Sequence, residues 1–165
     1  MAERVAALSR GLSRLVRAFA CAGLLAMSLI IAWQVFARYV LNASPAWAEQ
    51  AALLLMIWYV LLAAAAGVRE AFHIRIAAFV DLLAPRLRRV ALISAHLVVA
   101  GFGIAMTVWG CELVIATWEH VIPTLALPRG VAYLPMPLAG VLMFVFSLEH
   151  VVAEFRGRGV PPAWS

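Results

Sequence analysis

Hydrophobic residues gather into four long runs along the chain, separated by short stretches that hold most of the charged residues. The runs cover residues 18–37, 51–68, 90–111 and 130–148. A helix that crosses the hydrocarbon core of a membrane needs about 20 apolar residues, with a usual range of about 17 to 25. Each run is long enough, so the pattern predicts an all-α membrane protein with four transmembrane helices.

The composition supports this fold class. Hydrophobic residues make up 66% of the chain and charged residues 13%, and the mean hydropathy is +1.00. A soluble domain averages about 45–50% apolar and about 25% charged residues. Four spans occupy most of the 165 residues, which leaves no room for a soluble catalytic domain. We therefore expect no enzyme activity, no cofactor and no metal site.

The first run has one competing interpretation. Four arginines precede it, as in the basic region of a secretory signal peptide. The apolar core of a signal peptide has about 7 to 15 residues, however, and this run is longer. A first transmembrane helix is the better interpretation.

Arginine sets the expected orientation, because all 13 basic residues other than histidine are Arg and none is Lys. Eleven of them lie before the first run, between the second and third, or after the fourth. Only Arg38 and Arg129 lie on the opposite side. Basic residues are enriched in cytoplasmic loops of membrane proteins. Both termini and the middle loop are therefore predicted to be cytoplasmic, and the high pI requires no nucleic-acid partner.

The segments between the runs have patterns of their own. Residues 1–17 form a basic, amphipathic N-terminal segment, either lying on lipid or extending the first helix. Residues 72–83 repeat apolar positions at helical spacing and are predicted to form an interfacial helix that Pro85 ends. Residues 120–137 are too apolar for a free loop and should pack against something. Residues 18–155 form the transmembrane domain, and 156–165 are expected to be a disordered tail.

The turn between the first two runs begins at Tyr39. Ser44 and Pro45 are predicted to cap and start the second helix, and Trp47 with Tyr39 suits the headgroup level. Arg38 ends the first span and Glu49 opens the second. Our hypothesis is that these two charges form a structural clasp across the turn, and a substrate-binding role for Arg38 is the alternative.

Two spans contain small residues that favour close helix contact. Residues 63–67 read Ala-Ala-Ala-Ala-Gly, and Gly101 lies in the third run. Gly67 and Gly101 are therefore candidate contact positions for a partner. His96 also lies in the third run, where a hydrogen bond to a neighbouring helix or headgroup is favoured over a functional role.

Several short motifs occur in an order and spacing that resemble one known family. They are Gln34-Val-Phe-Ala-Arg-Tyr-Val-Leu-Asn42 before Ser44-Pro-Ala-Trp-Ala-Glu49, Trp58, Arg69-Glu70 with His73-Ile74, Leu83-Ala-Pro85, and Leu127-Pro128 with Tyr133, Pro135, Pro137 and Gly140. Together they resemble the small membrane subunit, the Q-subunit family, of tripartite ATP-independent periplasmic (TRAP) transporters. The acidic pair often found after the tryptophan is Glu49-Gln50 here, and Ala77 stands near the place of an aspartate often found after His-Ile.

The resemblance implies an accessory role in the bacterial inner membrane. In such systems a periplasmic binding protein captures an organic acid, a large multi-span subunit moves it using a sodium gradient, and the small subunit packs against the large subunit's static scaffold. Membrane lipids are the remaining partners expected. The interface or structural candidates are Arg38, Trp47, Glu49, Trp58, Gly67, Arg69, Glu70, His73, Gly101, Pro128, Tyr133 and Pro135.

Other classes of membrane protein fit the residues less well. A membrane cytochrome needs two histidines at matched depth on facing helices, and only His96 is expected inside a span. A proton-coupled exporter needs an intramembrane carboxylate, whereas the glutamates lie at helix ends. A structural or assembly subunit of another complex stays open. The sequence does not indicate which organic acid is carried, the stoichiometry, or whether residues 120–137 touch a binding protein.

Overall fold

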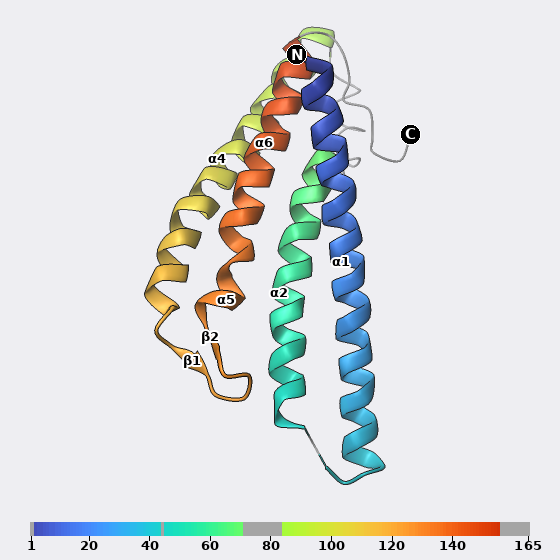
Figure 1. Cartoon of the computed structure of the whole chain (residues 1–165). Coiled ribbons are helices and arrows are strands. Elements are labelled where there is room, and N and C mark those ends of the chain that lie inside the picture. Colours follow the sequence, from blue (N-terminus) through green and yellow to red (C-terminus); the bar gives the residue numbers. More distant parts are fainter. Residues whose placement is uncertain (1, 44, 71–83, 156–165) are drawn as a thin grey trace.

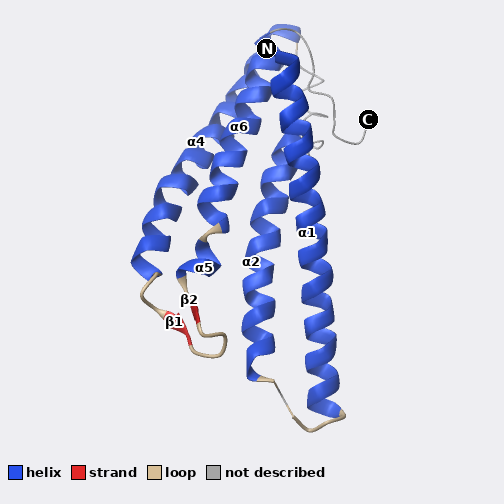
Figure 2. Ribbon diagram, in the orientation of Figure 1, coloured by secondary structure: helices blue, strands red, loops and turns tan. Residues whose placement is uncertain are grey.

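The computed structural model describes residues 2–43, 45–70 and 84–155, and these form mainly helices. The elements are α1 (Ala2–Tyr39), α2 (Ala46–Arg69), α4 (Pro85–Thr117), β1 (Val121–Ile122), β2 (Leu127–Pro128), α5 (Gly130–Tyr133) and α6 (Pro135–Phe155). Figure 2 shows these helices and the short strand pair. The interfacial helix expected at 72–83, the tail at 156–165, Ser44 and His73 lie outside the described residues.

Four helical segments in the described ranges are long and apolar enough to cross a membrane, which confirms the predicted fold class. They cover Gly11–Tyr39, Ala46–Arg69, Arg86–Thr117 and Gly130–Phe155. The segments run beyond the apolar runs because the charged residues that bound each run are themselves helical. The third helix ends at Thr117, six residues beyond its apolar run.

The helices lie side by side in the order α4, α6, α2, α1 (Figure 1). Helix α6 contacts both α4 and α2, and α2 contacts α1. We call the end where α1 begins and α6 ends the terminal end, and the end with the α1–α2 turn and the two strands the loop end. At the loop end, α1 and α2 reach further than the α4–α6 pair (Figure 1).

The contact between α4 and α6 is closest at a pair of glycines. A Cβ atom on Gly140 would lie 2.6 Å from the carbonyl oxygen of Gly103 and 2.6 Å from Oγ1 of Thr107. A Cβ on Gly103 would lie 2.7 Å from the carbonyl oxygen of Gly140. Lipid chains are as apolar as the side chains, so membrane helices associate largely through such close backbone packing. Gly103 and Gly140 therefore set the spacing of this helix pair.

The segment between α4 and α6 packs against the chain from Gly130 onward, as expected, whereas most residues from Trp118 to Arg129 are exposed. The strands β1 and β2 pair antiparallel, with Val121 opposite Pro128. The indole Nε1 of Trp58 in α2 donates a hydrogen bond of 3.1 Å to the carbonyl oxygen of Val131. A Cβ on Gly130 would lie 2.8 Å from the Trp118 ring. Trp58 thus ties α5 to the middle of α2.

Two helix starts differ from the expected ones. Helix α2 begins at Ala46, so Pro45 is its N-cap residue rather than its first helical residue. Helix α4 begins at Pro85 itself, five residues before the apolar run. Proline is well tolerated at the first position of a helix, because no intrahelical partner exists there for its missing N–H. Helix α1 is continuous across residues 17 and 18, where the sequence changes from basic to apolar.

We predict that Gly140→Leu separates α4 from α6. Overpacking a close contact costs typically about 1–3 kcal/mol, and here the new side chain meets backbone that cannot rotate away. The midpoint of thermal unfolding in detergent micelles should fall clearly. Gly101→Leu is the matched control, because a Cβ on Gly101 meets nothing within 4 Å. Equal midpoints for the two variants would contradict the close contact.

Candidate functional site

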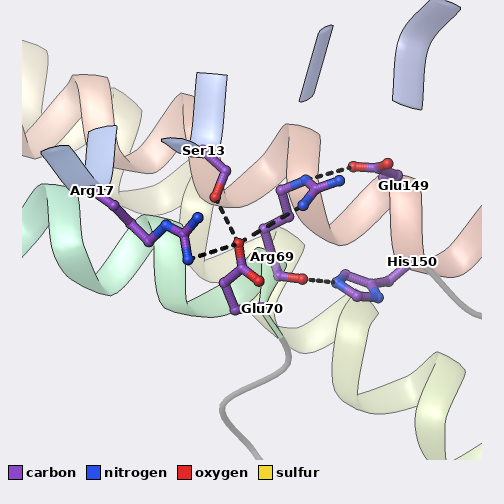
Figure 3. A network of polar contacts seen from close by, with 6 residues as sticks. All are labelled: Ser13, Arg17, Arg69, Glu70, Glu149 and His150. Atoms are coloured by element: carbon purple, nitrogen blue, oxygen red, sulfur yellow. Dashed lines mark hydrogen bonds and ion pairs between the residues drawn. The ribbon is translucent and has the colours of Figure 1, made fainter. Parts of the chain in front are cut away.

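A cluster of charged and polar side chains joins three helices at the terminal end. Helix α1 contributes Ser13 and Arg17, one helical turn apart and so on the same face. Arg69 is the last residue of α2 and Glu70 follows as its C-cap. Figure 3 shows these side chains meeting Glu149 and His150 of α6. The cluster lies at the end of α2, beside residues that lie one or more turns inside α1 and α6.

Glu70 is the meeting point of the first half of the cluster. Its Oε1 accepts a hydrogen bond of 3.0 Å from the Ser13 hydroxyl. The same oxygen lies 3.8 Å from Nη1 of Arg17 and 3.8 Å from Nη1 of Arg69 (Figure 3). Glu70 is only 6% exposed, so its charge depends on these three neighbours. They connect the first half of α1 to the end of α2.

Arg69 is the central residue of the second half of the polar cluster. Its side chain is fully buried, and its Nε lies 3.6 Å from Oε2 of Glu149. A buried charge is costly unless it is paired. Two arginines, Arg17 and Arg69, face two glutamates in this cluster, so its formal charges balance. The cluster thereby links α2 to α6 as well as to α1.

His150 closes the end of α2. Its Nε2 lies 3.0 Å from the carbonyl oxygen of Arg69, one of the last carbonyls of the helix, which have no intrahelical partner. A carbonyl only accepts, so Nε2 carries the proton in this hydrogen bond. The ring of His150 stacks on that of His96 from α4, with centroids 4.6 Å apart and planes 4° from parallel. His96 therefore brings the fourth helix to the cluster.

This stacking corrects one step of the sequence argument. Only His96 was expected inside a span, yet His150 lies beside it. The planes are parallel and in contact, so no haem fits between the rings, and His150 already bonds to Arg69. In addition, no group of three or more His, Cys, Asp or Glu within the described ranges is placed to hold a metal ion.

A further contact joins the beginning of α4 to the end of α6. The guanidinium of Arg89 donates to the carbonyl oxygen of Glu154 from Nε at 3.1 Å and from Nη2 at 2.6 Å, and from Nη2 to that of Phe155 at 3.0 Å. A cation at a helix C-terminus also interacts favourably with the helix dipole. Arg89 thus fixes the beginning of α4 to the end of α6.

A large apolar groove begins beside this cluster. It has a volume of about 780 Å³, and α1, α2, α4 and α6 all contribute to its lining. The lining residues are Arg17, Ala20, Cys21, Ala63, Ala64, Ala66, Gly67, Val68, Glu70, Val98, Val99, Phe102 and Met143. The residues from α2 are mostly small, which leaves room for another apolar group to approach its backbone.

A second, smaller cleft lies between α1 and α2 toward the loop end. Its volume is about 390 Å³, and Gln34, Arg38 and Glu49 are its polar residues. The structure thus brings Arg38 and Glu49, the two residues of the expected clasp, to one cleft. Ala52 is the buried residue of its lining.

The remaining predicted residues are spread over the molecule. Trp47 is exposed in the first turn of α2, and Gly101 faces open space on α4. Pro128 lies in β2, Tyr133 ends α5, and Pro135 begins α6 and is buried. These three hold the connection between α4 and α6 and contribute nothing to the polar cluster.

Comparison with known proteins identifies the family. Residues 27–157 match the family model for the DctQ component of tripartite ATP-independent periplasmic transporters. The chain belongs to this family. The four apolar spans and the family together identify a multi-pass protein of the inner membrane.

Two similar proteins are both named as permease proteins of TRAP transporters. The chain is 25% identical over 126 residues to the sialic acid TRAP transporter small permease protein SiaQ of Vibrio cholerae, covering 76% of the chain and 73% of that protein. It is 29% identical over 148 residues to the isethionate TRAP transporter permease protein DctMQ of Oleidesulfovibrio alaskensis, covering 84% of the chain but 23% of that protein. TRAP small permeases pair with a large membrane subunit, and DctMQ joins the two in one protein.

Only part of the polar cluster of this TRAP subunit could be recognised in the sequence. Arg69 and Glu70 were singled out, but Ser13 was not, and Arg17 and Glu149 were read as flanking charges. One signal was available for α1. Ser13 and Arg17 lie on the same helical face as Val16 and Ala20, which are buried. A serine and an arginine on an apolar face suggest a buried polar partner.

We predict that Arg69→Met strongly destabilises the small TRAP subunit. The change keeps a long side chain but leaves Glu70 and Glu149 without their shared cation, and removing one partner of a buried pair costs typically about 3–5 kcal/mol. Thermal unfolding in detergent measures the loss, with Arg129→Met on the exposed loop as the control. Adding Glu149→Gln to Arg69→Met should recover part of it. No recovery would mean that packing, rather than charge balance, accounts for the role of Arg69.

Proposed function

We propose that this chain is the non-catalytic small subunit of a sodium-coupled, binding-protein-dependent TRAP transporter for an organic acid, and that it stabilises the scaffold of the large transport subunit. The observation that carries the proposal is the position of its charges. In the described spans, the charged side chains lie toward helix ends, and the cluster around Arg69 serves to hold helices together. Secondary transporters bind substrate and ions near the midplane, at broken helices. None of the described spans is broken in its middle, because the fourth is interrupted only near its loop end, at Leu134 between α5 and α6. Transport therefore requires a partner that supplies such a site.

The names of the two relatives support an anionic substrate. One belongs to a transporter for sialic acid and the other to a transporter for isethionate. These two molecules share an acidic group and little else. An organic acid is therefore the proposed class, and its selection is expected in the binding protein and the large subunit rather than here.

The groove beside the polar cluster is the proposed docking surface for the large subunit. Ala63, Ala64 and Gly67 present α2 with little side-chain bulk, and Val98 with Phe102 of α4 adds an apolar wall. A partner helix gains van der Waals contact when small residues let its backbone approach. The neighbouring polar cluster holds this surface in one shape, because it fixes the ends of the helices that form it.

The arginine distribution supports an orientation with the terminal end in the cytoplasm. We predict the labelling of two engineered cysteines in a variant with Cys21 and Cys111 replaced by Ser. With a membrane-impermeant thiol reagent on cells whose outer membrane is permeable, Ala43→Cys should react from the periplasm. Leu87→Cys should react only after the inner membrane is opened. The reverse pattern would refute the orientation.

A bulky residue in the groove tests the proposed function directly. We predict that Ala64→Leu reduces co-purification of the tagged chain with its large subunit and lowers sodium-dependent uptake of the organic acid in proteoliposomes. Ala64 is exposed in the isolated chain, so the change should leave its own unfolding midpoint unaltered. Ala32→Leu, at an exposed position outside the groove, is the control. Full assembly and uptake with Ala64→Leu, or uptake by the small subunit alone, would contradict the proposal.

A further inference from the structure

The cleft between α1 and α2 has a polar end and an apolar remainder. Arg38 and Glu49 occupy the end near the turn, and Gln34 follows one turn deeper along α1. Below them the lining consists of Met27, Ile31, Ala52, Leu53 and Met56. The order along the helices, from charged to amide to apolar, is the order that a phospholipid presents from headgroup to acyl chain.

The length of the cleft matches one leaflet of a bilayer. Its lining on α1 runs from Met27 to Arg38, which is about 16 Å at a rise of about 1.5 Å per residue. The hydrocarbon core is about 30 Å thick, so the cleft extends over about half of it. A transmembrane helix of a partner would be expected to contact α1 and α2 over more than one leaflet. A lipid acyl chain spans one leaflet, so the length of the cleft fits an acyl chain.

The two charges favour a zwitterionic headgroup. A guanidinium has five N–H donors and binds phosphate in a bidentate manner, so Arg38 can hold a phosphate in addition to its contacts within the chain. The carboxylate of Glu49 accepts hydrogen bonds and attracts a cation. A primary ammonium group offers both a charge and N–H donors, whereas a quaternary ammonium has no N–H. An anionic headgroup without an amine meets repulsion from Glu49.

We propose that this cleft is a specific site for one aminophospholipid, phosphatidylethanolamine. Its phosphate lies on Arg38, its ammonium group on Glu49, and one acyl chain lies along Ile31 and Leu53. The lipid fills the space between α1 and α2 where no other described helix covers them. The occupied cleft completes the α1–α2 hairpin, and this role is separate from docking of the large subunit at the groove on the opposite half of α2.

Native mass spectrometry of the full chain tests the site. The chain is released from vesicles that contain equal amounts of phosphatidylethanolamine, phosphatidylcholine and phosphatidylglycerol, and retained lipid is counted. Wild type should retain one phosphatidylethanolamine. Arg38→Gln should weaken its retention about tenfold or more, as expected for loss of a charge-assisted contact. Glu49→Gln should keep a lipid but lose the preference for ethanolamine over choline and glycerol headgroups.

Two controls keep the result unambiguous. Arg129→Gln removes the other arginine near the loop end, which does not line the cleft, and should retain lipid as wild type does. A photoreactive residue at Ile31 should cross-link to phospholipid in the assembled complex. Equal retention by Arg38→Gln and wild type, equal retention of all three lipids by wild type, or cross-linking of Ile31 to a protein would each overturn the proposal. The retention measurements use the chain alone, so they do not depend on whether the large subunit docks at the groove.

Discussion

The arrangement of the terminal end depends on the buried charge of Arg69. A guanidinium remains protonated in proteins, so it cannot avoid the cost of burial by losing its proton. Moving an ion of this size from water into a medium of low dielectric constant costs on the order of 20 kcal/mol in the ideal limit, and several kcal/mol in real proteins. Only nearby anions and acceptors make such a position tolerable. Glu70 and Glu149 supply the anions, and each of them in turn requires its helix to stay in place.

Through Glu70, Glu149 and His150, the contacts of Arg69 are linked to all four long helices. Glu70 also needs Ser13 and Arg17, which fixes α1. The carbonyl oxygen of Arg69 needs His150, which fixes α6, and the stacking of His150 on His96 extends the contact to α4. In a membrane there is little hydrophobic drive to bring apolar helices together. Polar contacts at one end and the Gly103–Gly140 contact along α4 and α6 therefore take the part that a hydrophobic core plays in a soluble domain.

The spans could be predicted from the sequence because their lengths follow from bilayer thickness, which is the same for every protein. The packing of residues 130–137 could be predicted as well, since an apolar segment avoids water, but most of residues 120–129 are exposed. The polar cluster could not be predicted, because it depends on how each helix is rotated and tilted. A change of about 100° in the rotation of α1 would turn Ser13 away from Glu70. The depth of His150 was misjudged for a different reason: the apolar run stops at residue 148, whereas α6 continues to Phe155, so His150 lies inside the helix and level with His96.

The two ends of the molecule are built differently, and the difference fits an accessory subunit. At the terminal end the charges neutralise one another inside the chain and hold the helix row in shape. At the loop end α1 and α2 extend beyond the α4–α6 pair (Figure 1). There the charges of Arg38 and Glu49 line a cleft rather than a core. A subunit whose helices shifted against one another during transport would need a second arrangement of its buried charges, at the cost of breaking contacts to Arg69. The balanced cluster therefore favours one fixed internal arrangement of the four helices, which is what the proposed scaffold role requires.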